Sequence, residues 1–212
     1  MIKQFTFNHY EVNTYLVADA ASRRCAIVDP ACQASYEDEQ LRTYIANMGL
    51  TPTYVLLTHA HVDHIAGLRQ VCEYYGLPVS MHAEGHKLLR QAEAYGSIMG
   101  FAVDNMDDLD YAPLDDNQLL PLGETQIECR YVPGHCPGSL CFVLHEYRSV
   151  ITGDALFHFS IGRTDLPGGD YNLLISKLKD RILTLPDDYA VLPGHGIGSQ
   201  IGKEKKYNSF LL

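Results

Sequence analysis

A dense group of metal-binding side chains follows a short apolar run in this sequence. The run Tyr54–Leu57 has the composition of a buried strand, and residues 58–64 then read Thr-His-Ala-His-Val-Asp-His. Because alternate residues of an extended chain share a face, His59 and His61 can direct their rings toward one point. We expect Asp63 and His64 at the start of a following helix, where they can address a second point nearby. Imidazole and carboxylate groups suit zinc, iron or manganese, so the stretch predicts a metal site at a strand end.

Three further residues of ligand type occupy the same kind of position along the chain. His135, Asp154 and His195 each follow an apolar run that leads into a glycine. The strand fixes the place of the loop, and the glycine permits a sharp turn that projects the next side chain from the sheet edge. The sequence therefore predicts seven ligands: His59, His61, Asp63, His64, His135, Asp154 and His195.

Length and composition limit the classes of function. A chain of 212 residues, with 46% hydrophobic and 20% charged residues, predicts one soluble globular domain over residues 1–212. The net charge of −10 argues against a nucleic-acid partner, which requires clustered Lys and Arg. No apolar run reaches the length of a membrane span, and the first residues lack the apolar region of a signal peptide. The cysteines form no Cys-x-x-Cys pair, which favours reduced thiols and a cytoplasmic location.

Apolar patterning predicts two runs of strands, each finishing with helices. The first run has strands over 2–7, 13–18 and 25–28 as an antiparallel meander, a helix over 37–48, a strand over 53–57, a helix over 65–75, a strand over 78–81 and a helix over 84–95. Residues 96–116 lack a period and predict a loop or short irregular helices that overhang a cleft. The second run has strands over 118–120, 126–131, 140–144 and 149–152, a helix over 171–185 and a strand over 190–192. This order suggests an α+β fold, an αββα four-layer sandwich with helices outside two packed sheets.

The ligand motifs resemble those of the metallo-β-lactamase superfamily. The motifs are Thr58-His59-Ala60-His61-Val62-Asp63-His64, Pro133-Gly134-His135, Gly153-Asp154 and Pro193-Gly194-His195-Gly196, and they span nearly the whole chain. The resemblance implies that His59, His61 and His135 hold one metal ion. It also implies that Asp63, His64 and His195 hold a second ion, with Asp154 bridging the two. The implied cofactors are two divalent ions, zinc first, with iron or manganese as alternatives, and with positions left open for water.

Particular positions distinguish branches of this superfamily. His61 stands where the diiron flavoprotein branch has Glu, which disfavours reduction of oxygen or nitric oxide. Asp154 stands where the common antibiotic-hydrolysing branch has Cys, which disfavours β-lactamase activity. Residues 161–170 resemble a segment of small glyoxalase II-like hydrolases and of persulfide dioxygenases. Because only 17 residues follow His195, we expect no helical C-terminal domain of the kind that binds glutathione in larger glyoxalase II enzymes.

The resemblance implies a binuclear metallohydrolase of the hydroxyacylglutathione hydrolase type. Its substrate would be S-lactoylglutathione or a related hydroxyacyl thioester, attacked by metal-bound hydroxide, and Asp63 would be the catalytic residue that orients this group. We expect a small-molecule partner, no nucleic acid, no membrane, and a monomer or small homo-oligomer. The alternative is a persulfide dioxygenase with one iron at His59, His135 and Asp154.

Other residues are weaker candidates for roles around the metals. Asp29, at the end of a strand, is expected to support a ligand. Arg163 is expected to form a salt bridge with Asp165 or Asp170 that stiffens the loop beneath the metals. His158, four residues after Asp154, can line the pocket. Candidates for binding a substrate carboxylate are Tyr171, Lys203, Lys206 and Tyr207.

Overall fold

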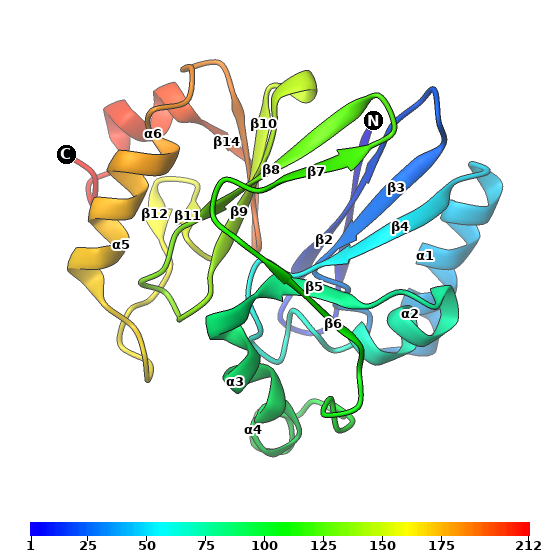
Figure 1. The fold of residues 1–212 in the computed structure, drawn as a ribbon. Helices are drawn as coiled ribbons and strands as arrows, with labels where there is room; N and C mark the ends of the chain where they lie inside the picture. The colour runs from blue at the N-terminus through cyan, green and yellow to red at the C-terminus, as the bar shows by residue number, and fades with distance from the viewer.

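The computed structural model describes residues 1–212 and contains two six-stranded mixed sheets (Figure 1). The first sheet has the order β1 (Ile2–Phe7), β2 (Val12–Ala18), β3 (Arg24–Val28), β4 (Thr51–Leu56), β5 (Val79–His82) and β6 (Tyr111–Leu114). The second has the order β14 (Ser199–Gln200), β13 (Ala190–Pro193), β10 (Ser149–Gly153), β9 (Leu140–Leu144), β8 (Thr125–Tyr131) and β7 (Leu119–Leu122). A two-stranded hairpin joins β11 (Leu156–Phe157) to β12 (Ser160–Ile161).

Helices cover the outer faces of both sheets (Figure 1). On the first sheet lie α1 (Ser35–Asn47), α2 (Leu68–Tyr75), α3 (His86–Arg90) and α4 (Ala92–Met99), and on the second lie α5 (Tyr171–Lys177) and α6 (Ile201–Tyr207). One buried cluster fills the space between the first sheet and its helices, a second fills the space between the sheets, and a third lies between the second sheet and its helices. The predicted αββα sandwich is therefore confirmed. Each helix is too short or too polar to span a membrane.

Strand β2 shows how the layers are built, because all seven of its residues are buried. Leu16 packs in the cluster beneath the helices, whereas Tyr15 and Val17 pack between the sheets, as the period of two requires. Each fully buried large apolar side chain stabilises the fold by about 1.5–3 kcal/mol. The polar members Asn13 and Thr14 are buried for a different reason. Their side chains hydrogen-bond to the loops after β13 and β3.

The loops that carry the predicted ligands meet because their strands run parallel. Strand β3 pairs parallel with β4, and β10 pairs parallel with β13. Since carboxyl ends of parallel strands lie at one edge of a sheet, Asp29 comes beside Thr58, and Asp154 comes beside His195. Two backbone hydrogen bonds then join the sheets at this edge, from Leu140 to the Thr58 carbonyl at 2.8 Å and from Asn13 to the Gly194 carbonyl at 2.7 Å.

Several predicted elements differ from the structure. The helix predicted over 65–75 begins only at Leu68, so Asp63 and His64 lie in turns and not at a helix start. The helix predicted over 84–95 is a 3₁₀ turn (Ala83–Gly85) followed by α3 and α4, and α4 continues past Gly96 to Met99. The helix predicted over 171–185 is α-helical only to Lys177 and continues as a π-helical turn over Leu178–Ile182.

Strand β6 falls within residues 96–116, where the sequence predicts only a loop or irregular helices. It contains Pro113, which is unfavourable in a central strand but tolerated at an edge. Strand β6 is an edge strand and pairs only with β5. Strands β11, β12 and β14 were also not predicted, because a strand of two residues has no measurable period. Helix α6 was not predicted because its sequence, Ile-Gly-Lys-Glu-Lys-Lys-Tyr, has too few apolar residues to form a stripe.

Candidate metal centre

Six of the seven predicted ligands form two groups of three. The three-histidine group consists of His59, His61 and His135, and the mixed group consists of Asp63, His64 and His195. Within each group the ligand atoms lie within 4.8 Å of one another. His61 Nδ1 is 2.9 Å from His135 Nε2, and His195 Nε2 is 3.3 Å from Asp63 Oδ2. Zinc with bonds of about 2.0–2.1 Å in a tetrahedron separates its ligand atoms by about 3.3 Å, so both groups have the spacing of a metal site.

The carboxylate of Asp154 lies between the two groups. Its Oδ1 is 3.3 Å from His64 Nε2. Its Oδ2 is 3.7 Å from His135 Nε2 and 3.6 Å from His195 Nε2. One side chain therefore reaches both the three-histidine group and the mixed group, which is the position that a bridging ligand requires.

Two buried polar atoms test whether these residues fit a cation. His59 Nε2 and Asp154 Oδ1 are both buried and have no hydrogen-bond partner in the protein. Leaving such an atom unsatisfied costs about 1–3 kcal/mol. A divalent ion beside each atom would remove that cost, and the set of five imidazoles and two carboxylates suits zinc, iron or manganese. The residues therefore fit a divalent metal centre.

Asp29 and Thr58 orient two of the ligand rings from behind. Asp29 accepts hydrogen bonds from Thr58 N at 2.7 Å and from Thr58 Oγ1 at 2.6 Å. Its Oδ2 also lies 3.0 Å from His64 Nδ1, while Thr58 Oγ1 lies 3.0 Å from His59 Nδ1. Because Nδ1 of each ring faces these partners, Nε2 remains free to face a metal. Asp29 thus has the contacts expected of a residue that supports a ligand.

Backbone carbonyls orient two more rings. His135 Nδ1 donates to the Arg163 carbonyl at 2.8 Å, and His195 Nδ1 donates to the Tyr10 carbonyl at 2.9 Å. A carbonyl can only accept, so these bonds fix the proton of each neutral ring on Nδ1 and direct Nε2 inward. His61 is the exception, because it turns Nδ1 toward His135.

The two groups differ in electrostatics. Burial lowers the pKa of His59 well below its usual value, lowers that of His61 to about 4, and lowers that of His135. In the mixed group, burial alone would lower the pKa of His64 and His195. The carboxylates of Asp154 and Asp63 outweigh it, raising the pKa of His64 well above its usual value and that of His195 as well. The same histidines hold the pKa of Asp63 and Asp154 low against burial.

The comparison with known families agrees with this geometry. Residues 8–195 match the sequence profile described as the metallo-beta-lactamase superfamily. The chain belongs to this superfamily. Its members are metal-dependent enzymes, and the histidine and aspartate groups described above are of that kind.

Relatives within the metallo-β-lactamase superfamily carry different names. The chain is 34% identical to the hydroxyacylglutathione hydrolase GloC of Haemophilus influenzae, over 95% of this chain and 93% of that protein. It is 32% identical to the human mitochondrial persulfide dioxygenase ETHE1, over 86% of this chain and 63% of that protein. Among solved structures, TTHA1623 in a di-iron-bound form has a TM-score of 0.87 at 34% identity, covering 99% of this chain and all of that one. The B3 metallo-β-lactamase BLEG-1 has a TM-score of 0.88 at 32% identity, covering all of this chain and 99% of that one.

Apart from Asp29, the side chains of the weaker candidates make no hydrogen bond or ion pair with a predicted ligand. Arg163 forms a two-bond ion pair with Asp165 at 2.8 Å, and both side chains are exposed. Asp170 does not join them, because it caps α5 by accepting from Leu173 N at 2.9 Å. His158 packs against Phe159, with ring centroids 4.0 Å apart. Tyr171, Lys203, Lys206 and Tyr207 make no hydrogen bond or ion pair with a ligand residue, and Lys206 instead lies over the Tyr207 ring.

Sequence reasoning missed the residues that act through the backbone. The Tyr10 and Arg163 carbonyls leave no signal in the sequence, since every residue type has a carbonyl. Thr58 could have been found, because it directly precedes His59 and carries a hydroxyl group.

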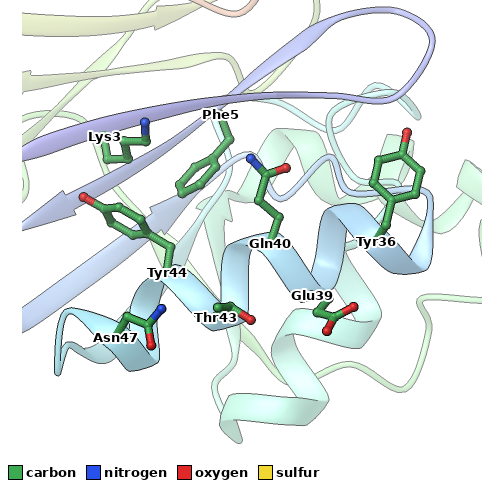
Figure 2. A pocket seen from close by; sticks show the side chains of 8 residues that line it. All are labelled: Lys3, Phe5, Tyr36, Glu39, Gln40, Thr43, Tyr44 and Asn47. Carbon is green, nitrogen blue, oxygen red and sulfur yellow. The ribbon is translucent and has the colours of Figure 1, made fainter.

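A groove of about 460 Å³ between β1 and α1 is a separate feature (Figure 2). It contains none of the predicted ligands and is lined by Lys3, Phe5, Tyr36, Glu39, Gln40, Thr43, Tyr44 and Asn47.

Gly194 leaves room for the centre, and replacing it should disrupt metal binding. A Cβ at this position would collide with Asp154 Oδ1 and lie 2.7 Å from His64 Cε1. We expect Gly194→Ala to lose at least one bound metal per chain, measured by elemental analysis after dialysis. The matched control is Gly196→Ala, whose Cβ meets open space and only strains a backbone φ of +72°. Equal metal content in Gly194→Ala and the unaltered protein would contradict this account.

The two groups should also differ in how metal binding depends on pH. His64 and His195 have raised pKa values, so below those values a metal entering the mixed group must displace protons. The three-histidine group has lowered pKa values, so it has fewer protons to lose to an entering metal between about pH 6 and 8. Titration of metal-free protein should show one affinity that is nearly constant over this range. The other affinity should rise by about tenfold per pH unit for each proton displaced. Equal slopes for both ions would contradict the assignment.

Proposed function

We propose that this protein is a binuclear metallohydrolase that hydrolyses small-molecule thioesters, as a hydroxyacylglutathione hydrolase does. The observation that carries the proposal is the pair of ligand groups with Asp154 between them. The three-histidine group would hold one divalent ion and the mixed group the other. Zinc is the first candidate, and the similarity to a di-iron-bound structure keeps iron as an alternative. The 34% identity to GloC supports a thioester such as S-lactoylglutathione.

Two divalent ions held by the three-histidine group and the mixed group would supply Lewis acidity and would lower the pKa of a water molecule toward about 7. The protein's own residues then have two tasks. Burial and the contacts of Asp29, Thr58 and the two carbonyls hold the rings in one orientation, which limits reorganisation during the reaction. Asp63 remains a carboxylate at neutral pH, because the charge of His64 and the hydrogen bond from His195 lower its pKa. It can therefore accept a hydrogen bond from the attacking water and orient it.

The exposure of the ligand side chains indicates the side from which a substrate can reach the centre. His59 and His64 are fully buried, whereas His195 is about one quarter exposed and His61 is half-buried. A substrate must therefore approach past His61 and His195. The ring of Phe157 lies 6.2 Å from that of His195 and offers an apolar contact there. A thiol of pKa near 8.5 is a good leaving group, so a thioester needs no strong acid at the site.

The second candidate function is that of a persulfide dioxygenase with one iron at His59, His135 and Asp154. The 32% identity to human ETHE1 favours it. The mixed group favours the hydrolase instead, because Asp63, His64 and His195 are brought within ligand distance of one another and would have no metal to bind in a mononuclear enzyme.

The proposed function is tested by combining metal analysis with a panel of substrates. Protein purified without chelator should contain about two divalent ions per chain and hydrolyse S-lactoylglutathione or another acyl thioester. The panel should include a β-lactam, because of the similarity to BLEG-1, and glutathione persulfide with an oxygen electrode. A single iron per chain with oxygen consumption on the persulfide would overturn the hydrolase proposal.

Asp63 is expected to matter far more for turnover than for folding. Asp63→Ala removes a ligand of the mixed group and the acceptor for the attacking water, so kcat for the thioester should fall by about 100-fold or more. The melting temperature of the metal-free protein should change by only a few degrees, since the residue lies in a turn outside the three core clusters. The control is Asp188→Ala, an exposed carboxylate paired with Arg148. Activity in Asp63→Ala equal to that of the control would exclude the proposed role.

A further inference from the structure

The turn between β1 and β2, residues 8–11, hydrogen-bonds to the loop that carries Asp63 and to the loop that carries His195. None of the side chains of this turn is a predicted ligand. Asn8 Nδ2 donates to the carbonyl oxygen of Asp63 at 2.9 Å. Two residues later, the Tyr10 carbonyl accepts the hydrogen bond from His195 Nδ1 at 2.9 Å. One short turn is therefore bonded to two ligands that lie more than 130 residues apart in the sequence.

Asn13, at the start of β2, extends this contact to both neighbours of His195. Its backbone N–H donates to the Gly194 carbonyl at 2.7 Å. Its side-chain Nδ2 donates to the Pro193 carbonyl at 3.0 Å and to the Gly196 carbonyl at 2.9 Å. The His195 loop is thus held to β2 on each side of the ligand, and its position follows that of the β1–β2 turn.

The conformation of Asn8 is itself fixed by several bonds. Its φ is +53°, in the left-handed region that Asn tolerates better than most residues. Its Oδ1 accepts from Tyr10 N at 2.9 Å, and its Nδ2 also donates to the Ala31 carbonyl at 3.0 Å. With the bond to Asp63, every polar atom of this side chain is used.

Glu37 anchors the turn from the opposite side. Its carboxylate is buried and accepts from the backbone N–H of Asn8 at 2.7 Å, of Gln33 at 2.8 Å and of Ala34 at 2.9 Å. It has no cationic partner, and its place in the first turn of α1 lets the helix dipole stabilise the charge. A buried carboxylate bonded to three backbone groups is a rigid anchor, because moving any of them leaves the charge unsatisfied.

The three-histidine group has different supports. His59 is oriented by Thr58, and His135 is oriented by the Arg163 carbonyl. Asn8 makes no hydrogen bond to a residue of this group. A change at Asn8 should therefore affect one half of the centre and spare the other.

We propose that Asn8, anchored by Glu37, is a positioning residue that sets the affinity of the mixed group for its metal ion. Asn8 fixes the backbone at Asp63 and, through the turn, the ring of His195. It thereby holds these two ligands at the separation that a single ion needs. This inference rests on the proposed two-ion centre, and it adds a residue that binds no metal and touches no substrate.

The test is zinc titration of metal-free protein against a competing chelator. Asn8→Asp keeps the size, the tolerance for positive φ and the acceptor for Tyr10 N, but it lacks both N–H donors. Asn8→Gly keeps the backbone conformation and lacks the side chain. In both variants one zinc affinity should fall by about 10- to 100-fold, while the other should change by less than about threefold. The control is Asn117→Asp, since Asn117 also has a left-handed φ, of +61°, and contacts no ligand.

Each outcome of this titration is decisive. Loss of one zinc affinity in both Asn8 variants, with Asn117→Asp unchanged, supports the proposal. Two unchanged affinities would overturn it, and so would an equal fall in both, which would mean that Asn8 acts on the fold as a whole. If the unaltered protein binds a single zinc ion with full occupancy, the two-ion centre itself fails, and this inference fails with it. Thermal unfolding of each variant shows whether the compared proteins are folded.

Discussion

One buried carboxylate, that of Asp29, organises the loop on which most of the centre depends. Isolated charges are costly inside a protein, and Asp29 is buried without a Lys or Arg partner. It is satisfied by the backbone and hydroxyl of Thr58 and by the ring of His64. The pairing of β3 with β4 brings Asp29 beside Thr58. The register of this parallel pair therefore determines the path of the loop after β4, which carries four of the predicted ligands.

Parallel strand pairing also positions the rest of the centre. Parallel pairing of β10 with β13 places Asp154 beside His195, and hydrogen bonds across the sandwich fix the two sheet edges against each other. The rings are then oriented from behind by the Thr58 hydroxyl and by the carbonyls of Arg163 and Tyr10. A divalent ion would thus enter a site whose ligands are already close to their bound positions, which reduces the cost of ordering them.

The layers could be predicted from the sequence, and so could the strand ends at which the ligand-type side chains come together, because both leave periodic or local signals. Alternating apolar residues predict β1 and a continuous apolar run predicts β9, and the recurrence of a glycine before His135, Asp154 and His195 predicts ligands at strand ends. Features decided by tertiary contact could not be predicted. The helix after the ligand loop begins late because the Gly67 N–H donates to the Pro30 carbonyl at 2.9 Å and so does not take part in the hydrogen bonds of the helix. The contributions of Asn8 and Glu37 depend on backbone groups far away in the sequence.

The metal-binding framework and the substrate are separate questions in this superfamily. Relatives of similar identity are named as a hydroxyacylglutathione hydrolase and as a persulfide dioxygenase, so the fold alone does not select the reaction. For this chain, the two candidate functions differ in whether the mixed group holds an ion, because the proposed hydrolase uses two ions and the proposed dioxygenase uses one iron at His59, His135 and Asp154.

Anomalous X-ray diffraction at metal absorption edges, from crystals of protein purified without chelator, tests this most directly. We expect two peaks about 3.5–4 Å apart, one among His59, His61 and His135 and one among Asp63, His64 and His195. A single peak held by His59, His135 and Asp154, with the mixed group empty, would contradict it.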